Sequence, residues 1–536
     1  MTEAPAGAAS ETAPVILAVD LGTSAIKAAL VTTRGEVLGW ESQSIALHLL
    51  PEGGAEQSPT KWWDAFLSVA RKLLGRGHVA REAIVAICCS TQGEGTVAVD
   101  RDGNALMNAI LWMDMRGAPF INQRLRGRLN VAGASVFKAM RFVRLTGGMP
   151  SPTGKDPAAH MLLVRERFPA IYERTYKFLN VLDFLNLRLT GRFVATADSI
   201  LTSWVTDNRN PDAVRYHPGL LRESGIDPDK FPEIVPCTAV LGPVRAEVAA
   251  ALGLSSHVQV VAGSIDNTAA AIGAGAVEDY VPHLYLGTSS WVAAHVPFKR
   301  TDVRSALASV PCAVPGRYLL TALQATAGGN LTFLRDKILF CADGLTAPAP
   351  TGEPTFAAID RIAGAVPAGA NGVIYTPWIW GERAPVDDRN LRAAFFNLSL
   401  DNDRRDVIRA VFEGVAFNTR WLMEPVRRFV GRAVAKLHVA GGGASSDVWC
   451  QIFADVLGME VVQVKDPLQA NARGAAFIAA VGLGHATFAD VPALTAVKRT
   501  YTPTPQHQPL YDERFGVFVE FYRRNRGLYQ RLNGDR

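Results

Sequence analysis

Two short segments of glycine and hydroxyl residues carry the clearest chemical signal in this sequence. One segment is Gly22, Thr23 and Ser24, and the other is Gly287, Thr288 and Ser289. Each lies between two apolar runs, which predicts a tight turn joining two β-strands. Successive backbone N–H groups in such a turn can converge on an anion, and hydroxyl groups add further donors. The pair therefore predicts two phosphate-binding hairpins, although each turn alone also has a purely structural explanation.

The two turns belong to a longer internal repeat. Between Leu21 and Val31, seven of eleven residues are identical to those found 265 positions later. This offset is close to half of the 536-residue chain. Whereas repeats of 20–50 residues indicate solenoids, a half-length repeat indicates two similar domains that face each other. We expect bound phosphates to lie between the two turns.

The first copy of the repeat carries charges that the second copy lacks. Asp20 and Lys27 stand where the second copy has Tyr285 and Val292. Because Mg²⁺ in proteins is commonly held by one or two carboxylates together with phosphates and water, Asp20 is a candidate ligand, directly or through water. The alternative is that the Asp20 side chain only caps its own turn.

Asp266 is the candidate general base. It follows an apolar segment and precedes three alanines, a pattern that predicts a strand ending where a helix begins. A carboxylate in that place can accept the proton of an attacking hydroxyl group. The alternative is that Asp266 serves only as a helix N-cap.

The surrounding elements follow a mixed α/β pattern, with predicted strands and helices alternating along the chain. The spacing of apolar residues predicts an amphipathic helix over Lys61–Leu74 and a buried strand over Ile84–Cys89. Longer helices are predicted over Asp406–Val430 and Arg514–Leu532. The stretch Ile362–Gly381 has no charged residue, but its glycines and prolines indicate a turn, a buried strand and a loop rather than a membrane span.

The net charge and the cysteines indicate which partners are expected and in which compartment the protein resides. The net charge is only +5, and the basic residues are spread along the chain, so no nucleic acid and no membrane partner is expected. The nearest approach to a basic cluster is Arg523, Arg524 and Arg526, which we interpret as a solvated helix face. The six cysteines form no C-x-x-C pair, which favours free thiols in the cytoplasm.

Three further segments, taken with the repeat, resemble the FGGY family of carbohydrate kinases. These are Gly263–Asn267, the run Gly441–Gly443 continuing to Ser446, and Gly381–Pro385 followed by Arg409–Gly414. The resemblance extends from about Val15 to Gly484. It implies an α/β fold of two actin/hexokinase-like (ribonuclease H-like) ATPase domains around a central cleft. We expect a disordered tail (1–13), an N-terminal domain (14–276), a C-terminal domain (277–498) and a helical extension (499–536).

The same resemblance implies which residues bind the nucleotide and the metal. Asp266 is the family's catalytic base and, with Asp20, the expected Mg²⁺ site, with ATP as co-substrate. The expected nucleotide-binding residues are Gly22, Thr23, Ser24, Lys27, Gly287, Thr288, Gly328, Gly441, Gly442, Gly443 and Ser446. Two residues depart from the family pattern. The family usually has glycine at the position of Asn397 and often an acidic residue at the position of Gln469.

The sugar-binding segment narrows the substrate less sharply. Residues Thr91–Thr96 resemble those of erythritol kinases, Gln92 and Glu94 also match glycerol kinases, and the Leu111–Arg116 segment is typical of pentulose and polyol kinases. The expected substrate-binding residues are Gln92, Gly93, Glu94, Trp112, Asp114, Asp266 and Asn267. Glu94 has the alternative of an exposed loop residue, and Trp112 that of a core aromatic. A hexonate substrate is disfavoured because no cationic residue stands out beside Gln92, although an arginine from elsewhere in the chain could serve.

Three functions are therefore weighed. The first is a sugar kinase acting on a pentulose such as D-xylulose, with a polyol as the alternative substrate. The second is an actin-like or chaperone-like protein in which ATP controls assembly or partner binding. The third is an inactive sugar-binding relative, which the intact Asp20, Lys27 and Asp266 argue against. A homodimer is left open. Gly273 and Gly275 are expected either to form a hinge between the halves, which would meet only through a few connections there, or to allow close helix packing.

Overall fold

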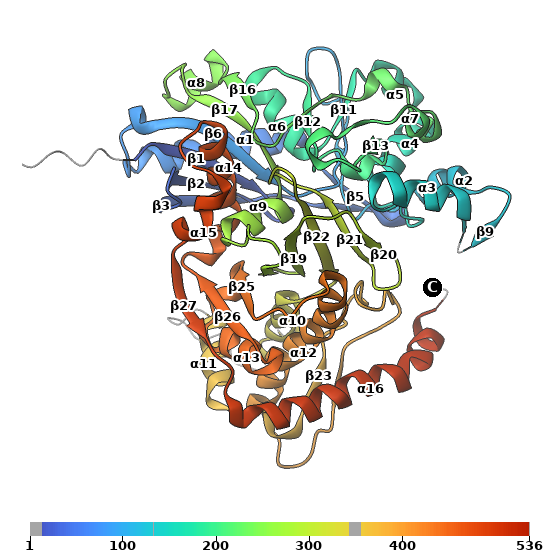
Figure 1. The fold of residues 1–536 in the computed structure, drawn as a ribbon, viewed down its shortest axis with the longest axis vertical. Helices are drawn as coiled ribbons and strands as arrows, with labels where there is room; N and C mark the ends of the chain where they lie inside the picture. The colour runs from blue at the N-terminus through green and yellow to red at the C-terminus, as the bar shows by residue number, and fades with distance from the viewer. Residues whose placement is uncertain (1–12, 132, 342–354, 535–536) are drawn as a thin grey trace, which may run out of the picture.

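The computed structural model describes residues 13–131, 133–341 and 355–534. Two halves, each built on one large β-sheet, follow one another along the chain (Figure 1). All but the last residue of the tail expected over 1–13 lies outside the described residues. Among the described helices, none has both the length and the apolar character needed to cross a membrane.

The N-terminal sheet has six strands in the order β16-β17-β6-β1-β2-β3. Its strands span Val240–Pro243, Gln259–Ile265, Ile84–Thr91, Val15–Leu21, Ala25–Thr32 and Val37–Ser44. The first three in sequence form an antiparallel meander, and β6 and β17 then pair in parallel beyond β1. Strand β1 is buried along its whole length because both faces of the sheet are covered, which explains its continuous run of apolar residues.

The C-terminal sheet repeats this pattern in its middle. Five of its eight strands, in the order β22-β19-β18-β25-β26, show the same sequence of antiparallel, antiparallel, parallel and parallel pairings. They span Tyr318–Gln324, Ser290–Val296, Pro282–Leu286, Lys436–Ala440 and Glu460–Val464. The sequence repeat thus corresponds to two equivalent hairpins, β1–β2 and β18–β19, as predicted.

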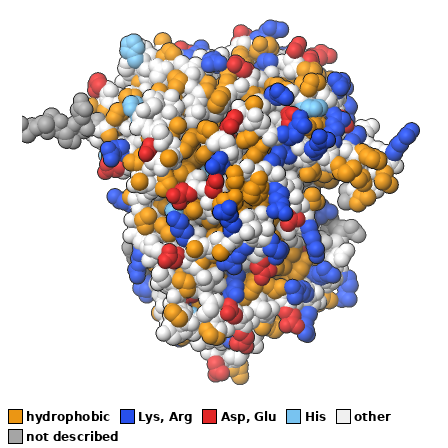
Figure 2. Space-filling view, viewed as in Figure 1, with side chains coloured by type: hydrophobic (Ala, Val, Ile, Leu, Met, Phe, Trp, Pro, Cys, Tyr) orange, Lys and Arg blue, Asp and Glu red, His pale blue; other side chains and the backbone are white. Residues whose placement is uncertain are grey.

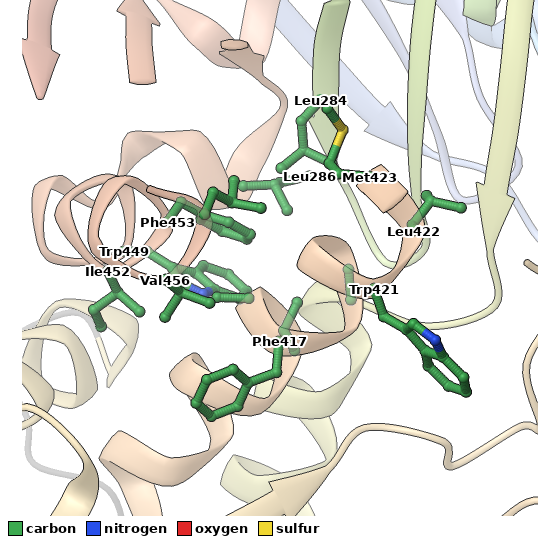
Figure 3. Packing of buried hydrophobic residues seen from close by; sticks show 14 of the residues in the cluster. Leu284, Leu286, Phe417, Trp421, Leu422, Met423, Trp449, Ile452, Phe453 and Val456 are labelled. Atoms are coloured by element: carbon green, nitrogen blue, oxygen red, sulfur yellow. The ribbon is translucent and has the colours of Figure 1, made fainter. Parts of the chain in front are cut away.

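The core of the C-terminal half forms between its sheet and two helices, α12 (Arg404–Val430) and α13 (Asp447–Leu457). Figure 3 shows Trp449 and Phe453 of α13 beside Leu284 and Leu286 of β18, with Phe417 of α12 nearby. Glycine at position 414 lets α12 lie close to the backbone of strand β23 (Ile374–Thr376), because a Cβ there would stand 2.3 Å from the Tyr375 carbonyl oxygen. This packing fixes the strand that leads into the second turn.

The described residues of the expected helical extension, 499–534, belong to this core. Strand β27 (Val497–Tyr501) pairs with β26 at the sheet edge, and α16 (Gln508–Asn533) buries Tyr511 and Phe518. The Tyr511 hydroxyl donates to Glu413 at 2.8 Å and accepts from Arg409 at 3.0 Å. A buried ion pair between Arg409 and Glu413, at 2.7 Å, completes the triad. The family-signature residues in α12 therefore hold α16 in place.

The predicted helices and strands named above are present with small changes of bounds. They are α1 (Pro59–Gly75), β6, α12 and α16. The charge-free stretch Ile362–Gly381 differs from its prediction, since its first four residues complete helix α11 (Thr355–Ala365). Its middle forms the predicted buried strand, β23 (Ile374–Thr376).

Helices α9 (Asp266–Gly273) and α14 (Ala470–Gly482) join the two halves. A Cβ at Gly273 would stand 1.8 Å from the Ala470 carbonyl oxygen, and one at Gly474 would stand 1.9 Å from that of Ala269. Both glycines therefore allow two helix backbones to touch, which is the packing alternative foreseen for Gly273. Helix α14 comes from the C-terminal half of the sequence, yet it also packs on the N-terminal sheet (Figure 1).

The halves also meet away from these helices. The Lys299 ammonium group donates to the Val143 carbonyl at 2.8 Å, and the Tyr318 hydroxyl donates to the Arg209 carbonyl at 2.8 Å. The expectation that the halves meet only near residues 273–278 is therefore wrong. Short sequence patterns do not show contacts between residues more than 100 positions apart.

Candidate active site

The first turn is held by a network of amide and aromatic side chains. The Thr23 hydroxyl donates to Gln92 Oε1 at 2.8 Å and accepts from Trp112 Nε1 at 3.1 Å. The Thr23 carbonyl accepts from Gln57 Nε2 at 2.7 Å. Gln57 Oε1 in turn accepts from Gln92 Nε2 at 3.1 Å, and from Trp62. The predicted nucleotide-binding and sugar-binding segments are thus joined, and Trp112 is a half-buried hydrogen-bond donor rather than a core aromatic.

The side chain of Asp20 is shared between the two halves. Its Oδ2 accepts from Lys27 Nζ at 3.1 Å, and its Oδ1 accepts from Asn471 Nδ2 at 3.1 Å. The Asp20 carboxylate raises the pKa of Lys27, against the opposing effect of burial, so Lys27 is a permanent cation. Because Asp20 lies inside β1 and its partners are side chains, the turn-capping alternative does not describe it.

Tyr285 faces this charged pair from the second hairpin. Its ring stacks on Trp291 with centroids 4.2 Å apart. Burial and the carboxylates of Asp20 and Asp266 raise the pKa of Tyr285 to about 12, against the opposing effect of Lys27. The residues at equivalent positions of the repeat, Asp20 and Tyr285, therefore lie within electrostatic reach of each other. This brings the two halves of the repeat together, as the sequence predicted.

Asp266 stands where β17 ends and α9 begins, again as predicted. Its Oδ1 accepts from the neighbouring Asn267 N–H at 2.8 Å, and the helix N-cap position belongs to Ile265. Burial, together with the carboxylates of Asp20 and Glu94, raises the pKa of Asp266 to about 7 against the opposing effect of the Asn267 N–H. A carboxylate with a pKa near neutrality is suited to accept a proton at physiological pH.

The second turn is supported from behind by two glycines. Gly328 and Gly329 donate their N–H groups to the carbonyls of Gly287 and Thr288 at 2.9 and 3.0 Å. A Cβ at Gly328 would stand 2.6 Å from the Gly287 carbonyl oxygen, so a larger residue would push the turn away. Thr288 is left exposed at the tip. Gly328 therefore contributes by shaping the turn.

The three glycines at 441–443 differ from one another. Gly441 has φ of 88°, and a Cβ there would stand 2.7 Å from the Leu286 carbonyl oxygen, just before the second turn. Gly443 packs against Trp449, whereas a Cβ at Gly442 would meet nothing closer than 3.7 Å. The first and third glycines thus bring this segment close to the second turn, and Gly442 is exposed.

Ser446 is occupied by protein partners. Its hydroxyl accepts from the Trp449 N–H at 2.8 Å and donates to Asp360. It is the N-cap of α13. The side chain therefore has a structural explanation in addition to the predicted contact with the nucleotide.

The sugar-binding loop carries Glu94 in a left-handed conformation with φ of 61°. Burial raises the pKa of Glu94, while Arg383 and Lys155 lower it. Glu94 is only partly accessible, so the alternative of an exposed loop carboxylate does not fit. Arg383 and Lys155 come from distant segments, and neither was singled out as a sugar-binding residue from the sequence.

Asp114 is fully buried and its oxygens are already engaged. They accept from the Ala55 N–H at 2.8 Å, from the Arg116 N–H at 2.9 Å, and from the Arg116 guanidinium group at 2.7 Å. Arg116 also pairs with Glu56 at 2.6 Å. Asp114 therefore acts on this site by holding the loop that carries Trp112, and not as a free acceptor for a substrate hydroxyl group.

Several residues of the site were missed in the sequence. Gln57 and Asn471 lie in it, but no glycine-rich or acidic motif marks them, and Tyr285 was noted only as the repeat equivalent of Asp20. Asn471 and Asp20 are 451 positions apart. The one available signal was the departure at Gln469, which lies in the same segment as Asn471.

Comparison with known families accounts for both halves. Residues 15–273 match the N-terminal domain of the FGGY family of carbohydrate kinases, and residues 284–483 match its C-terminal domain. The chain belongs to the FGGY family of carbohydrate kinases. This FGGY kinase is therefore a sugar phosphotransferase, and the alternative of an actin-like assembly protein is set aside.

Relatives of this FGGY kinase align over nearly its full length. The xylulose kinase of Staphylococcus epidermidis is 29% identical over 517 residues, covering 96% of this chain and 97% of that protein. The gluconokinase of Bacillus licheniformis is 24% identical over 525 residues, with 96% and 97% covered. Among solved structures, the xylulose kinase of Rhodospirillum rubrum superposes with a TM-score of 0.77 at 26% identity, covering 96% of this chain and 100% of that one. The shared architecture is therefore that of a two-domain sugar kinase.

Proposed function

We propose that this FGGY kinase transfers the γ-phosphate of ATP to a hydroxyl group of a pentulose such as D-xylulose. The observation that carries the proposal is the position of Asp266, whose pKa is raised to about 7, within electrostatic reach of both Asp20 and Glu94. The xylulose kinases that align with the whole chain support the choice of sugar.

The proposed reaction needs positioning and charge neutralisation more than covalent help. Asp266 accepts the proton of the attacking hydroxyl group, which then attacks the γ-phosphorus as the bond to ADP breaks. The exposed tips of the two turns, at Ser24 and Thr288, donate hydrogen bonds to the phosphates. Lys27 supplies a permanent positive charge beside them.

Magnesium fits the carboxylates of this site. Asp20 and Asp266 are close enough for the charge of Asp20 to raise the pKa of Asp266, so a divalent cation would relieve their repulsion. In the described part of the chain no group of three or more acidic, histidine or cysteine residues could hold a metal. Mg²⁺ commonly uses one or two carboxylates with phosphates and water, and Asp20 and Asp266 offer such a pair. When bound, Mg²⁺ would neutralise charge on the phosphates.

A hexonate is the second candidate substrate, because Arg383 and Lys155 act on Glu94 and could also attract a carboxylate. We favour a neutral sugar. Glu94 offsets part of that positive charge, and the nearby Asp156 would repel an acid. An uncharged pentulose or polyol can instead accept and donate hydrogen bonds among these groups without adding charge.

A coupled assay of ADP release tests the substrate directly. D-xylulose, erythritol, glycerol and gluconate are compared at matched concentrations, each with ATP and Mg²⁺. The highest kcat/KM for D-xylulose is expected. A higher value for gluconate would refute a neutral sugar, and one for erythritol would replace the pentulose by a polyol.

The compartment and the assembly are also proposals. We place the enzyme in the cytoplasm, since Cys88, Cys89, Cys237, Cys312 and Cys450 form no disulfide among the described residues and ATP is its co-substrate. Its proposed small-molecule partners are the sugar and ATP or ADP, and no nucleic acid. Light scattering after size-exclusion chromatography distinguishes a monomer from a homodimer.

A further inference from the structure

A projecting part of the N-terminal half carries positive charge without any negative charge. It consists of α2 (Ala118–Leu125), the short hairpin β9–β10 (Asn130–Val131 and Ala134–Ser135) and α3 (Val136–Thr146). We call it the basic lobe. Over residues 118–146 the sequence has six Lys or Arg and no Asp or Glu. Arg124, Arg126 and Arg128 lie close together in the sequence, and Lys138, Arg141 and Arg144 follow at every third residue.

The basic lobe also exposes large apolar side chains. Leu129 and Val131 of the hairpin are 56% and 65% exposed, and Phe137 and Met140 of α3 are 64% and 56% exposed. Helix α3 buries Phe142 and Leu145 on its other face, so its outer apolar residues are not needed for the core. Figure 2 shows hydrophobic side chains gathered on the part that projects at the right, with Lys and Arg side chains beside them.

Several of the cations are available to a partner. Arg126, Arg128 and Arg144 are exposed, and none of them makes an ion pair with an acidic group of the described residues. Arg141 differs, since it lies 3.4 Å from Glu223. Exposed cations around apolar tips are the combination that binds the interface of an anionic bilayer, where cations attract headgroups and apolar side chains enter the acyl boundary.

We propose that the basic lobe is a docking surface for anionic lipid membranes. The lobe is convex and projects from the body (Figure 1), so a fluid surface can surround its tips, whereas a folded partner would need a matching hollow. A second copy using the same face would bring six cations against six. The proposal reverses the sequence-based expectation that the chain has no membrane partner. It does not depend on which sugar is phosphorylated.

Co-sedimentation with vesicles tests the proposal on the full chain. Wild-type protein is mixed with vesicles of phosphatidylcholine alone, or of an equal mixture with phosphatidylglycerol, at low and high salt. Binding is expected only with the mixed vesicles and mainly at low salt, because salt screens the attraction. No sedimentation with the mixed vesicles at low salt would overturn the proposal.

Two lobe variants and one control locate the surface. R126Q/R128Q should lower the partition coefficient roughly fivefold for each cation removed. F137S/M140S should lower it roughly tenfold or more. The control R523Q/R531Q removes the same charge from exposed positions of α16 and should bind as wild type. Thermal unfolding and ATP-dependent kinase activity verify that each variant is folded.

The remaining outcomes also decide the matter. Equal loss in the control would mean that overall charge, and not the lobe, attracts the vesicles, which overturns the assignment. Wild-type binding by F137S/M140S would exclude insertion of the apolar tips. A dimer seen by light scattering and dissolved by R126Q/R128Q would make a second copy the occupant and refute the membrane assignment.

Discussion

Replacing Asp266 by asparagine tests the proposed base, because it keeps the shape of the side chain but removes its ability to take a proton. The pKa of Asp266 is about 7 against an ordinary value of 3.8. Since one pH unit corresponds to 1.36 kcal/mol, ionising this carboxyl in the folded protein costs at most about 4 kcal/mol. The sugar-dependent rate of Asp266→Asn should fall by about 10²–10⁴-fold, while ATP still binds.

The raised pKa of Asp266 also predicts that Asp266→Asn, although less active, is more stable than the wild type. When folding raises the pKa of a carboxyl, the folded protein loses stability as the pH rises from the carboxyl's pKa in the unfolded state, near 4, to its pKa in the folded state, near 7. Asp266→Asn should therefore have a larger free energy of unfolding than wild type at pH 8, and an equal one near pH 4. Wild-type kcat/KM should also decline as the pH falls below about 7.

Urea unfolding at the two pH values and a coupled assay of ADP release measure these effects together. The reasoning is refuted if Asp266→Asn turns over sugar at nearly the wild-type rate. The electrostatic explanation alone is refuted if the variant gains no stability at pH 8, since the carboxyl would then not be held in an unfavourable charged state. A variant that is inactive but unchanged in stability would leave the base assignment standing and remove the electrostatic explanation.

Three further results are expected. Glu94→Ala should raise the sugar KM about tenfold and change the ranking of sugars, with ATP KM unchanged; an unchanged ranking would remove Glu94 from the sugar site. Asn471→Ala should raise the Mg²⁺ concentration for half-maximal rate by about tenfold without changing the sugar KM, because the Asp20 carboxylate loses the hydrogen bond from Asn471 at 3.1 Å. An unchanged Mg²⁺ dependence would contradict this. Gly441→Ala should lower the free energy of unfolding in urea by about 1–3 kcal/mol, because its Cβ would stand 2.7 Å from the Leu286 carbonyl oxygen. The matched Gly442→Ala should be tolerated, and equal effects of the two substitutions would refute this explanation.

The sequence predicts a feature of the site where all the residues that form the feature lie in one short segment. The hairpins β1–β2 and β18–β19 follow from apolar runs around a Gly-Thr-Ser turn, and their equivalence follows from the repeat. Asp266 follows in the same way from a strand and a helix that adjoin it. In each case the residues that form the feature are neighbours along the chain, so their pattern survives without knowledge of the fold.

Only the tertiary structure decided which distant residues complete the site. Asn471 reaches Asp20 because α14 crosses from the C-terminal half onto the N-terminal sheet, and Gly273 and Gly474 let the helices approach closely enough. Likewise, only the structure shows that the carboxylate oxygens of Asp114 already accept hydrogen bonds from the Ala55 N–H and the Arg116 guanidinium group. The physical reason is that a side chain's role depends on which donors and charges lie within a few ångströms, and packing brings those groups together from separate segments whose local patterns do not specify one another.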